Sequence, residues 1–150
     1  MPTSPPQPLD KRRVLIVDDE EVLRMLARDM LHEFGYAPTL AASGEEALAV
    51  LAEQPGVFDV VVIDLRLPGL TGAEVVQRIA SLDPTVAIVA MSGLDAHSLE
   101  QALDGAVVSA MLTKPFHMNG LIDAIERSMP LPQVPPQPPN PRRSAAETWR

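Results

Sequence analysis

Short apolar runs and longer amphipathic segments alternate along the chain. Runs rich in valine and isoleucine, apolar at nearly every position, are typical of strands buried on both faces of a sheet. Segments in which apolar residues recur every three or four positions are typical of helices with one buried face. The predicted strands are residues 14–17, 37–42, 60–63, 85–91 and 107–112, and the predicted helices are residues 22–34, 43–54, 73–81, 95–103 and 118–129. This alternation predicts an α/β fold in which helices cover both faces of a parallel sheet.

Individual residues refine this picture. The segment Ser43-Gly-Glu-Glu46 is a capping box that begins the second helix, and Gly35 stands where the first helix should end. Pro38 indicates that the second strand lies at a sheet edge or begins there. Methionine fills irregular gaps between apolar side chains, so most methionines are predicted to lie in the core. They are Met25, Met30, Met91, Met118 and Met129.

The prolines are concentrated near the two ends of the chain, which distinguishes the ends from the middle. Of the 16 prolines, four lie in residues 1–8 and seven in residues 130–150. Segments of this composition bury little apolar surface and favour extended, polyproline-like conformations. We therefore predict one folded domain over residues 10–129 between two disordered proline-rich tails, residues 1–9 and 130–150. We expect no DNA-binding or catalytic output domain after residue 129.

Charge and composition exclude several classes of function. Residues 9–129 contain 9 Lys and Arg against 19 Asp and Glu, a net charge of −10. Direct nucleic-acid binding needs basic surface that displaces phosphate counterions, so this class is not expected. The absence of cysteine excludes disulfides and thiolate metal sites. No signal peptide precedes the domain and no apolar run could span a bilayer, so the protein is predicted to be cytoplasmic with no membrane partner.

Polar side chains suited to one chemical site follow four of the five predicted strands. They are Asp18 and Asp19 after the first, Asp64 after the third, Ser92 after the fourth and Lys114 after the fifth. Ligands of open parallel sheets bind at the carboxyl ends of the strands, so we expect these side chains to lie close together. Clustered carboxylates repel one another and need a cation, and a donor set made only of oxygen favours Mg²⁺. An ammonium group beside them suits an anion, and these are the parts of phosphoryl transfer to a nucleophilic carboxylate.

Four stretches carry a resemblance to a known family. VLIVDDEEVLRMLARDML, VVVIDLRLPGLTGAEVVQRI, VAIVAMSG and MLTKPF occur in this order, within residues 13–129. Together they resemble the receiver domain of bacterial two-component response regulators. The resemblance implies a flavodoxin-like (βα)₅ fold, a doubly wound parallel five-stranded sheet with strand order 2-1-3-4-5.

The resemblance also implies a metal site and a phosphoacceptor. Asp64 matches the phosphoacceptor position of the family. Asp19 and Asp64 match the carboxylates that bind Mg²⁺ directly, and Asp18 matches the one that acts mainly through water. The backbone carbonyl of Arg66 is implied as a further ligand of the metal.

Other positions match the parts of the family that contact the phosphoryl group and respond to it. Ser92 is implied to hydrogen-bond the phosphoryl group and Lys114 to pair with it, and the Lys114–Pro115 peptide bond is expected to be cis. Family members commonly carry Tyr or Phe three residues before the lysine, at the position that Met111 occupies here. The resemblance therefore implies Ser92 and Met111 as the switch residues, with the ring of the usual aromatic residue replaced by a flexible side chain.

Arg66 and Leu94 lie two residues after Asp64 and Ser92, at positions that flank the phosphoryl group in this family. We expect the size and charge of these two side chains to tune the lifetime of the phosphorylated state, because they affect the approach of water.

The function implied is that of a phospho-accepting switch or relay. Its phosphoryl donor would be the phosphohistidine of a histidine kinase or of a histidine phosphotransfer protein. Its output would pass to a downstream protein through direct contact, and a homodimer is compatible with the resemblance. Transfer and slow hydrolysis are carried out by the domain itself, so we do not expect a conventional enzyme.

Three alternatives differ in their chemistry. A pseudo-receiver that only binds proteins is left open by Met111, although Asp64 and Lys114 are both present. A Mg²⁺-dependent phosphohydrolase of the haloacid dehalogenase type wants a second Asp two residues after its nucleophile, where this chain has Arg66. Dinucleotide binding is weaker still, because Asp-Asp-Glu-Glu follows the first strand in place of a glycine-rich turn.

Overall fold

The computed structural model describes residues 12–93 and 96–129, and in this part strands and helices alternate as predicted. The predicted tails, residues 1–9 and 130–150, lie outside the described residues. The elements are β1 (Arg13–Val17), α1 (Glu21–Glu33), β2 (Ala37–Ala41), α2 (Gly44–Glu53), β3 (Val60–Asp64), α3 (Gly72–Leu82), β4 (Ala87–Ser92), α4 (Ala96–Leu103), β5 (Ala110–Thr113) and α5 (Met118–Ser128).

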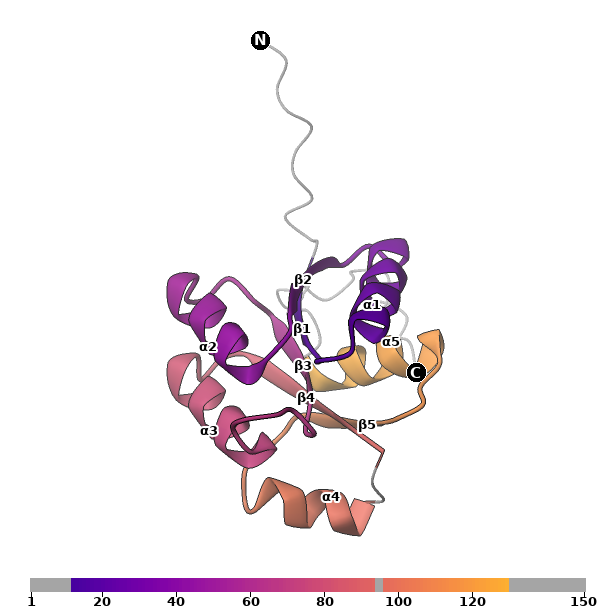
Figure 1. Ribbon diagram of the computed structural model, residues 1–150. Coiled ribbons are helices and arrows are strands. Elements are labelled where there is room, and N and C mark those ends of the chain that lie inside the picture. Colours follow the sequence, from indigo (N-terminus) through magenta and orange to yellow (C-terminus); the bar gives the residue numbers. More distant parts are fainter. Residues whose placement is uncertain (1–11, 94–95, 130–150) are drawn as a thin grey trace, which may run out of the picture.

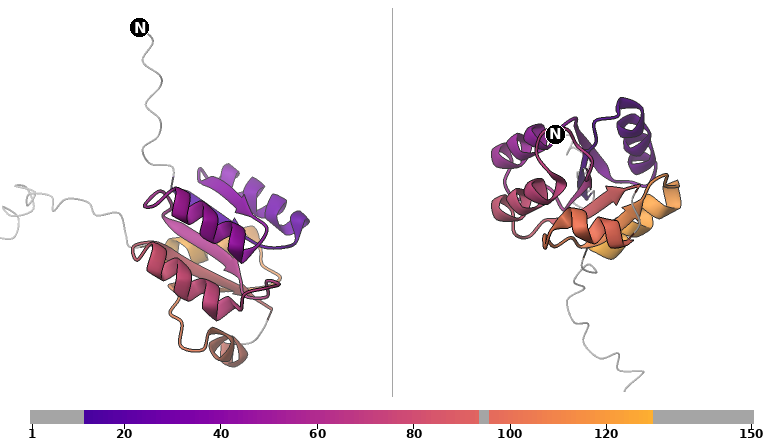
Figure 2. Two further views of the ribbon diagram at one scale, coloured as in Figure 1. Left: turned by 60° about the vertical axis from the view of Figure 1, so that its left-hand side comes forward. Right: turned by 60° about the horizontal axis from the view of Figure 1, so that its bottom comes forward.

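The strands form one parallel sheet in the order β2-β1-β3-β4-β5, which confirms the predicted strand order. Helices α1 and α5 cover one face of the sheet, and α2 and α3 cover the other (Figure 1). The two further views in Figure 2 show the same three layers. From β1 the chain first adds β2 on one side and then β3 on the other. The carboxyl ends of β1 and β3 therefore flank the point where strand order reverses, where ligands of such sheets bind.

The three central strands are buried on both faces, which explains why they are apolar at every position except one end, where β1 has Arg13, β3 has Asp64 and β4 has Ser92. In β1, Val14 and Ile16 pack in the apolar cluster beneath α1 and α5, whereas Leu15 and Val17 pack in the cluster beneath α2 and α3. The residues of β3 divide between the two clusters in the same way. This alternation fixes the register of the strands, because a shift by one residue would exchange the two faces.

Local signals in the sequence act as predicted around α1 and α2. The Ser43 hydroxyl accepts a hydrogen bond from the Glu46 backbone N–H at 3.1 Å, and the Glu46 carboxylate accepts one from the Ala42 N–H at 2.9 Å. Gly35 follows α1 with a φ of +85°, a conformation that glycine adopts without strain. β2, which contains Pro38, is an edge strand.

The fourth strand begins later than predicted, at Ala87 in place of Thr85. The Asp83 carboxylate accepts hydrogen bonds from both the backbone N–H and the hydroxyl of Thr85, at 3.1 and 2.7 Å. This side-chain turn competes with strand pairing and keeps Thr85 in the loop.

The prediction that the fifth strand begins at Val107 is wrong, because β5 begins at Ala110. The turn after α4 uses positive φ values at Asp104 (46°) and Gly105 (85°). Ser109 then binds β4 through both its backbone and its side chain, since its N–H donates to the Ile88 carbonyl and its hydroxyl accepts from the Ile88 N–H. Of the residues between, Ala106 and Val108 pack against the apolar core, whereas Val107 is 82% exposed.

Helix α1 exposes several apolar side chains that its periodicity assigned to the core. The core prediction for Met25 is wrong, because this side chain is 43% exposed. Val22 and Leu26 are 69% and 48% exposed, while Ala27 and Leu31 are buried against the sheet. The core prediction holds for Met91 and Met129, which are buried. Within the described residues, none of the helices is both long and apolar enough to span a membrane.

Candidate functional site

The polar residues that follow the strands meet at the carboxyl edge of the sheet. Asp18 follows β1 directly, Asp64 and Ser92 are the last residues of β3 and β4, and Lys114 follows β5. Asp18, Asp64 and Ser92 are buried, although all three are polar. Register places Asp64 beside Met91, the residue before Ser92. The edge thus gathers side chains from four strands, as the sequence predicted.

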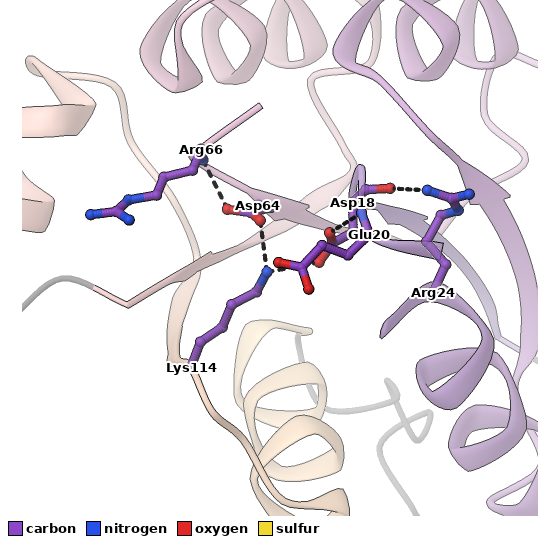
Figure 3. Close-up of polar contacts among 6 residues, drawn as sticks. All are labelled: Asp18, Glu20, Arg24, Asp64, Arg66 and Lys114. Carbon is purple, nitrogen blue, oxygen red and sulfur yellow. Dashed lines mark hydrogen bonds and ion pairs between the residues drawn. The ribbon is translucent and has the colours of Figure 1, made fainter. Parts of the chain in front are cut away.

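One ammonium group joins the two buried carboxylates (Figure 3). Lys114 Nζ donates to Asp64 Oδ2 at 2.7 Å and to Asp18 Oδ2 at 2.8 Å. Burial disfavours the charged ammonium, but the hydrogen bonds to the two carboxylates and their negative charges outweigh it. The pKa of Lys114 is therefore raised above its ordinary value, and the lysine is charged at neutral pH.

The second oxygen of each buried carboxylate is held by the backbone. Asp18 Oδ1 accepts from the Glu20 N–H at 2.9 Å, and Asp64 Oδ1 accepts from the Arg66 N–H at 2.8 Å. In both cases the donor lies two residues after the aspartate, a local turn that short acidic side chains favour. Each of the two carboxylates therefore accepts hydrogen bonds at both of its oxygens, which fixes its orientation toward Lys114.

Asp19 adds a third carboxylate, and this one is exposed. One carboxylate oxygen from each of Asp18, Asp19 and Asp64 lies within 4.8 Å of the others. Three carboxylates around the single ammonium of Lys114 leave an excess of negative charge, and their oxygens are the donors that a hard divalent cation prefers. This acidic pocket can therefore hold a metal ion, and its donor set fits Mg²⁺.

Arg24 is a part of this site that the sequence reasoning missed. Its Nη1 donates to the backbone carbonyl oxygen of Asp18 at 2.6 Å, and Figure 3 shows the guanidinium on the far side of Asp18 from Lys114. Arg24 belongs to the first turns of α1, where its own N–H bonds to the Glu20 carbonyl. A basic residue six positions after the aspartate, at the start of the following helix, was the signal available in the sequence.

The remaining predicted site residues are placed differently. The Arg66 side chain is exposed and extends away from Asp64 and Lys114 (Figure 3), so only its backbone lies at the carboxylate. Met111 lies in β5 and is 42% exposed. The Lys114–Pro115 peptide bond is cis, the isomer expected from the sequence. Leu94 lies outside the described residues.

A mostly apolar pocket lies beside Lys114, between α1 and the segment after β5. Its volume is about 290 Å³. Lys114 belongs to its wall, so the residue whose ammonium binds Asp64 also borders this pocket. The exposed Val22 and Met25 lie on the same helix. The lining residues are Leu23, Leu26, Met30, Lys114, Pro115 and Phe116.

Comparison with known proteins agrees with the geometry. The sequence model of the response regulator receiver domain matches residues 14–126. Sporulation initiation phosphotransferase F of Bacillus subtilis is 28% identical over 120 residues, which are 79% of this chain and 94% of that protein. Response regulator receiver protein CpdR of Brucella abortus is 29% identical over 118 residues, which are 79% of this chain and 97% of that protein.

A solved structure supports the same assignment. Chemotaxis protein CheY4 of Vibrio cholerae superimposes with a TM-score of 0.73 at 28% identity, covering 79% of this chain and 99% of that one. The family match covers β1 from its second residue, every element from α1 to β5 completely, and α5 as far as residue 126. The chain therefore belongs to the response regulator receiver domain family of two-component signalling systems.

Proposed function

We propose that this receiver domain accepts a phosphoryl group on Asp64 from the phosphohistidine of a histidine kinase or of a histidine phosphotransfer protein. The observation that carries the proposal is the placement of Lys114 Nζ, 2.7 Å from Asp64 Oδ2 and beside two further carboxylates at the sheet edge. Asp64 lies at the carboxyl end of a central strand, the edge at which ligands of parallel sheets bind, and its neighbours fix its orientation.

The proposed step is a displacement at phosphorus. A carboxylate oxygen of Asp64 forms the new O–P bond while the N–P bond of phosphohistidine breaks, and the imidazole nitrogen keeps the electron pair and takes up a proton. The Lys114 ammonium pairs with the Asp64 carboxylate before the transfer and with the phosphoryl oxygens after it. The Ser92 hydroxyl donates a hydrogen bond to the phosphoryl oxygens. Hydrolysis of the acyl phosphate by water returns Asp64 to its carboxylate form and releases inorganic phosphate.

The residues that would hold Mg²⁺ are the carboxylates of Asp18, Asp19 and Asp64 and the backbone carbonyl of Arg66. Bound there, the ion would neutralise charge on the acceptor and on the incoming phosphoryl group. The chain contributes the fixed part of this arrangement. The Glu20 and Arg66 N–H groups hold one oxygen of Asp18 and one of Asp64, which leaves the other oxygens directed toward the centre of the pocket.

The response to phosphorylation would pass through Ser92 and Met111. Ser92 is buried at the end of β4, and Met111 lies on the neighbouring strand with a partly exposed, flexible side chain. Arg66 and Leu94 flank the proposed phosphoryl position in sequence and would tune the lifetime of the acyl phosphate. The exposed Arg66 side chain is free to reach over the modified Asp64, where its charge would act on the attacking water.

The phosphohistidine-bearing protein would dock on the exposed apolar side chains of α1 and on the adjoining pocket. Val22, Met25 and Leu26 supply apolar area on one helix, and the pocket shares Lys114 with the acceptor site. A donor seated there would bring its phosphohistidine to Asp64. Exposed apolar groups of this kind, next to a polar site, are typical of protein contacts.

The same proposal describes the chain as a switch or relay and not as a conventional enzyme, acting in the cytoplasm and signalling to a downstream protein by contact. The name of the Bacillus subtilis relative, a phosphotransferase, supports the relay variant. A homodimer is a further form compatible with the proposal.

Phosphorylation by a small-molecule donor tests the central claim. The purified chain is incubated with acetyl phosphate and Mg²⁺, and intact mass and amide chemical shifts are recorded. We expect one added phosphoryl group in the wild type and in Asp123→Asn, an exposed carboxylate on α5, and none in Asp64→Asn. Modification that persists in Asp64→Asn, or its absence from the wild type, would contradict the proposal. Modification without changed amide shifts would favour a relay over a switch.

A further inference from the structure

The peptide unit between Asp18 and Asp19 is held from the side by an arginine. The Asp18 carbonyl oxygen accepts from Arg24 Nη1 at 2.6 Å. The Asp18 N–H, in the preceding peptide unit, donates to the Ala41 carbonyl of β2 at 3.1 Å. Hydrogen bonds to a charged donor are stronger than neutral ones, so the guanidinium restrains the plane of this peptide unit firmly.

This restraint matters most for Asp19. The carboxylates of Asp18 and Asp64 each accept bonds at both oxygens, so their orientation does not depend on the Asp18 carbonyl. The exposed Asp19 carboxylate receives no hydrogen bond or ion pair from any described residue. Its place within 4.8 Å of the other two follows from the backbone that carries it, and that backbone begins at the peptide unit that Arg24 holds.

We infer that Arg24 is a positioning residue for the divalent cation, acting through the Asp18–Asp19 peptide unit on the carboxylate of Asp19. The inference rests on the proposed function, since it concerns the metal site that serves phosphorylation. It identifies a role for a residue that contacts neither the acceptor nor the phosphoryl group. Groups that orient metal ligands from behind typically change metal affinity by 10- to 100-fold when they are removed.

Electrostatics alone predicts the opposite sign. The guanidinium is a positive charge near a cation site, so its removal would strengthen cation binding if charge were its main influence. Positioning predicts that removal weakens binding. The sign of the change in affinity therefore separates the two roles of Arg24.

The test measures binding of Mn²⁺, used as a probe for Mg²⁺, from the loss of the electron paramagnetic resonance signal of the free ion. No phosphoryl donor is present. We expect roughly tenfold weaker binding in Arg24→Met, which keeps an apolar stem but has neither donor nor charge. Arg24→Lys, whose ammonium can donate to the same carbonyl, should recover part of the loss. Amide spectra of the metal-free Arg24→Met variant should show a shifted Asp19 N–H within an otherwise preserved fold.

Arg28→Met is the matched control, because Arg28 lies one turn further along α1 and pairs with Asp29 on the surface. It removes the same charge from the same helix and should leave Mn²⁺ affinity unchanged. Unchanged or tighter binding in Arg24→Met would overturn the inference, as would Arg24→Lys binding no better than Arg24→Met. A wild-type chain that binds no Mn²⁺ would instead contradict the proposed function.

Discussion

Lys114 Nζ lies 2.7 Å from Asp64 Oδ2, although the two residues are 50 positions apart in the chain. The same ammonium lies 2.8 Å from Asp18 Oδ2, so one cation serves two buried carboxylates. The pair of carboxylates repel each other, and Lys114 is the group that offsets this repulsion among the described residues. Removing the lysine and removing one carboxylate should therefore have opposite effects on stability.

Lys114→Met should destabilise the fold when no divalent cation is present. The substitution leaves two buried carboxylates without their shared cation, and a lost charged partner of this kind typically costs about 1–3 kcal/mol in the free energy of unfolding. Urea unfolding in the presence of a chelator measures the change. Arg127→Met, which breaks the exposed ion pair with Asp123 on α5, is the control and should cost less than about 1 kcal/mol.

Asp64→Asn should have the opposite sign under the same conditions. It relieves the repulsion between Asp64 and Asp18 and leaves Lys114 paired with one carboxylate, so the free energy of unfolding should rise by about 1 kcal/mol. Added Mg²⁺ should stabilise the wild type more than this variant, because the variant has lost a ligand. Equal destabilisation by Asp64→Asn and Lys114→Met would show that the repulsion is not significant.

Gly72, the first residue of α3, has no space for a side chain. A Cβ at this position would lie 2.8 Å from Leu65 Cδ2 and 3.0 Å from the Leu65 carbonyl oxygen, and the backbone atom cannot easily move. Gly72→Ala should therefore lower the free energy of unfolding by about 1–3 kcal/mol. Because Leu65 follows Asp64, we also expect altered amide shifts around the acceptor.

Gly120 in α5 provides the matched substitution. Its added Cβ would meet Leu112 Cδ1 at 3.6 Å, an ordinary van der Waals contact. Alanine favours the helix interior over glycine by about 1 kcal/mol, so Gly120→Ala should stabilise the fold by up to that amount. Thermal unfolding of both variants checks the pair, and a destabilising Gly120→Ala would show that the contact with Leu112 is tighter than the structure indicates.

The sequence was sufficient to predict the architecture and the edge at which the site lies. Apolar runs identified all five strands, and the carboxyl ends of parallel strands meet by geometry, so Asp18, Asp64 and Lys114 were expected together. Their detailed pairing could not be predicted. Whether Lys114 contacts one carboxylate or two depends on a few tenths of an ångström in the placement of β1, β3 and the segment after β5.

Other features depended on contacts that have no local signature. The start of β5 is set by how Ser109 binds Ile88, a residue 21 positions earlier. The exposure of Met25 depends on how α1 is rotated over the sheet, and helical periodicity alone does not define the width of the buried stripe. The hydrogen bond from Arg24 to the Asp18 carbonyl likewise depends on the angle between β1 and α1.

Tyr36 should titrate above its ordinary pKa of about 10. Burial of the phenol is the largest cause of the raised pKa, and the Glu126 carboxylate raises the pKa further. The positive charge of Arg12 lowers it in part. A folded state with the higher pKa holds the proton more tightly than the unfolded state. The stability that this contributes is therefore fully present below pH 10 and is lost as pH rises through the raised pKa. Tyr36 is the only tyrosine in the sequence, so near-ultraviolet absorbance of tyrosinate reports it directly.

Substitution of the two charged neighbours checks these causes. Glu126→Gln should lower the titration midpoint of Tyr36, and Arg12→Gln should raise it. If neither substitution changed the titration midpoint of Tyr36, burial would be the sole cause of its raised pKa. A wild-type midpoint at or below the ordinary value would contradict the partial burial of Tyr36 against the apolar cluster beneath α1 and α5.

The exposed apolar residues of α1 should matter for a protein donor and not for a small one. Val22→Ser and Met25→Ser remove apolar area from side chains that are 69% and 43% exposed, so the fold should tolerate both. If the phosphohistidine protein docks there, transfer from a phosphorylated histidine kinase domain should slow about tenfold, the effect of losing a contact residue worth more than 1 kcal/mol. Phosphorylation by acetyl phosphate should be unchanged, because that donor is too small to touch α1 and the acceptor together.

Phe34→Ser separates docking from a general loss of apolar surface. Phe34 is 46% exposed, similar to Met25, but it follows the last turn of α1, at the opposite end of this helix from Val22. Its substitution should leave both transfer rates unchanged. Equal slowing by Phe34→Ser and Val22→Ser would indicate a nonspecific apolar effect, whereas slowing with acetyl phosphate would place Val22 or Met25 in the acceptor chemistry itself. Slowing confined to Val22→Ser and Met25→Ser with the protein donor is the pattern that docking beside Lys114 requires.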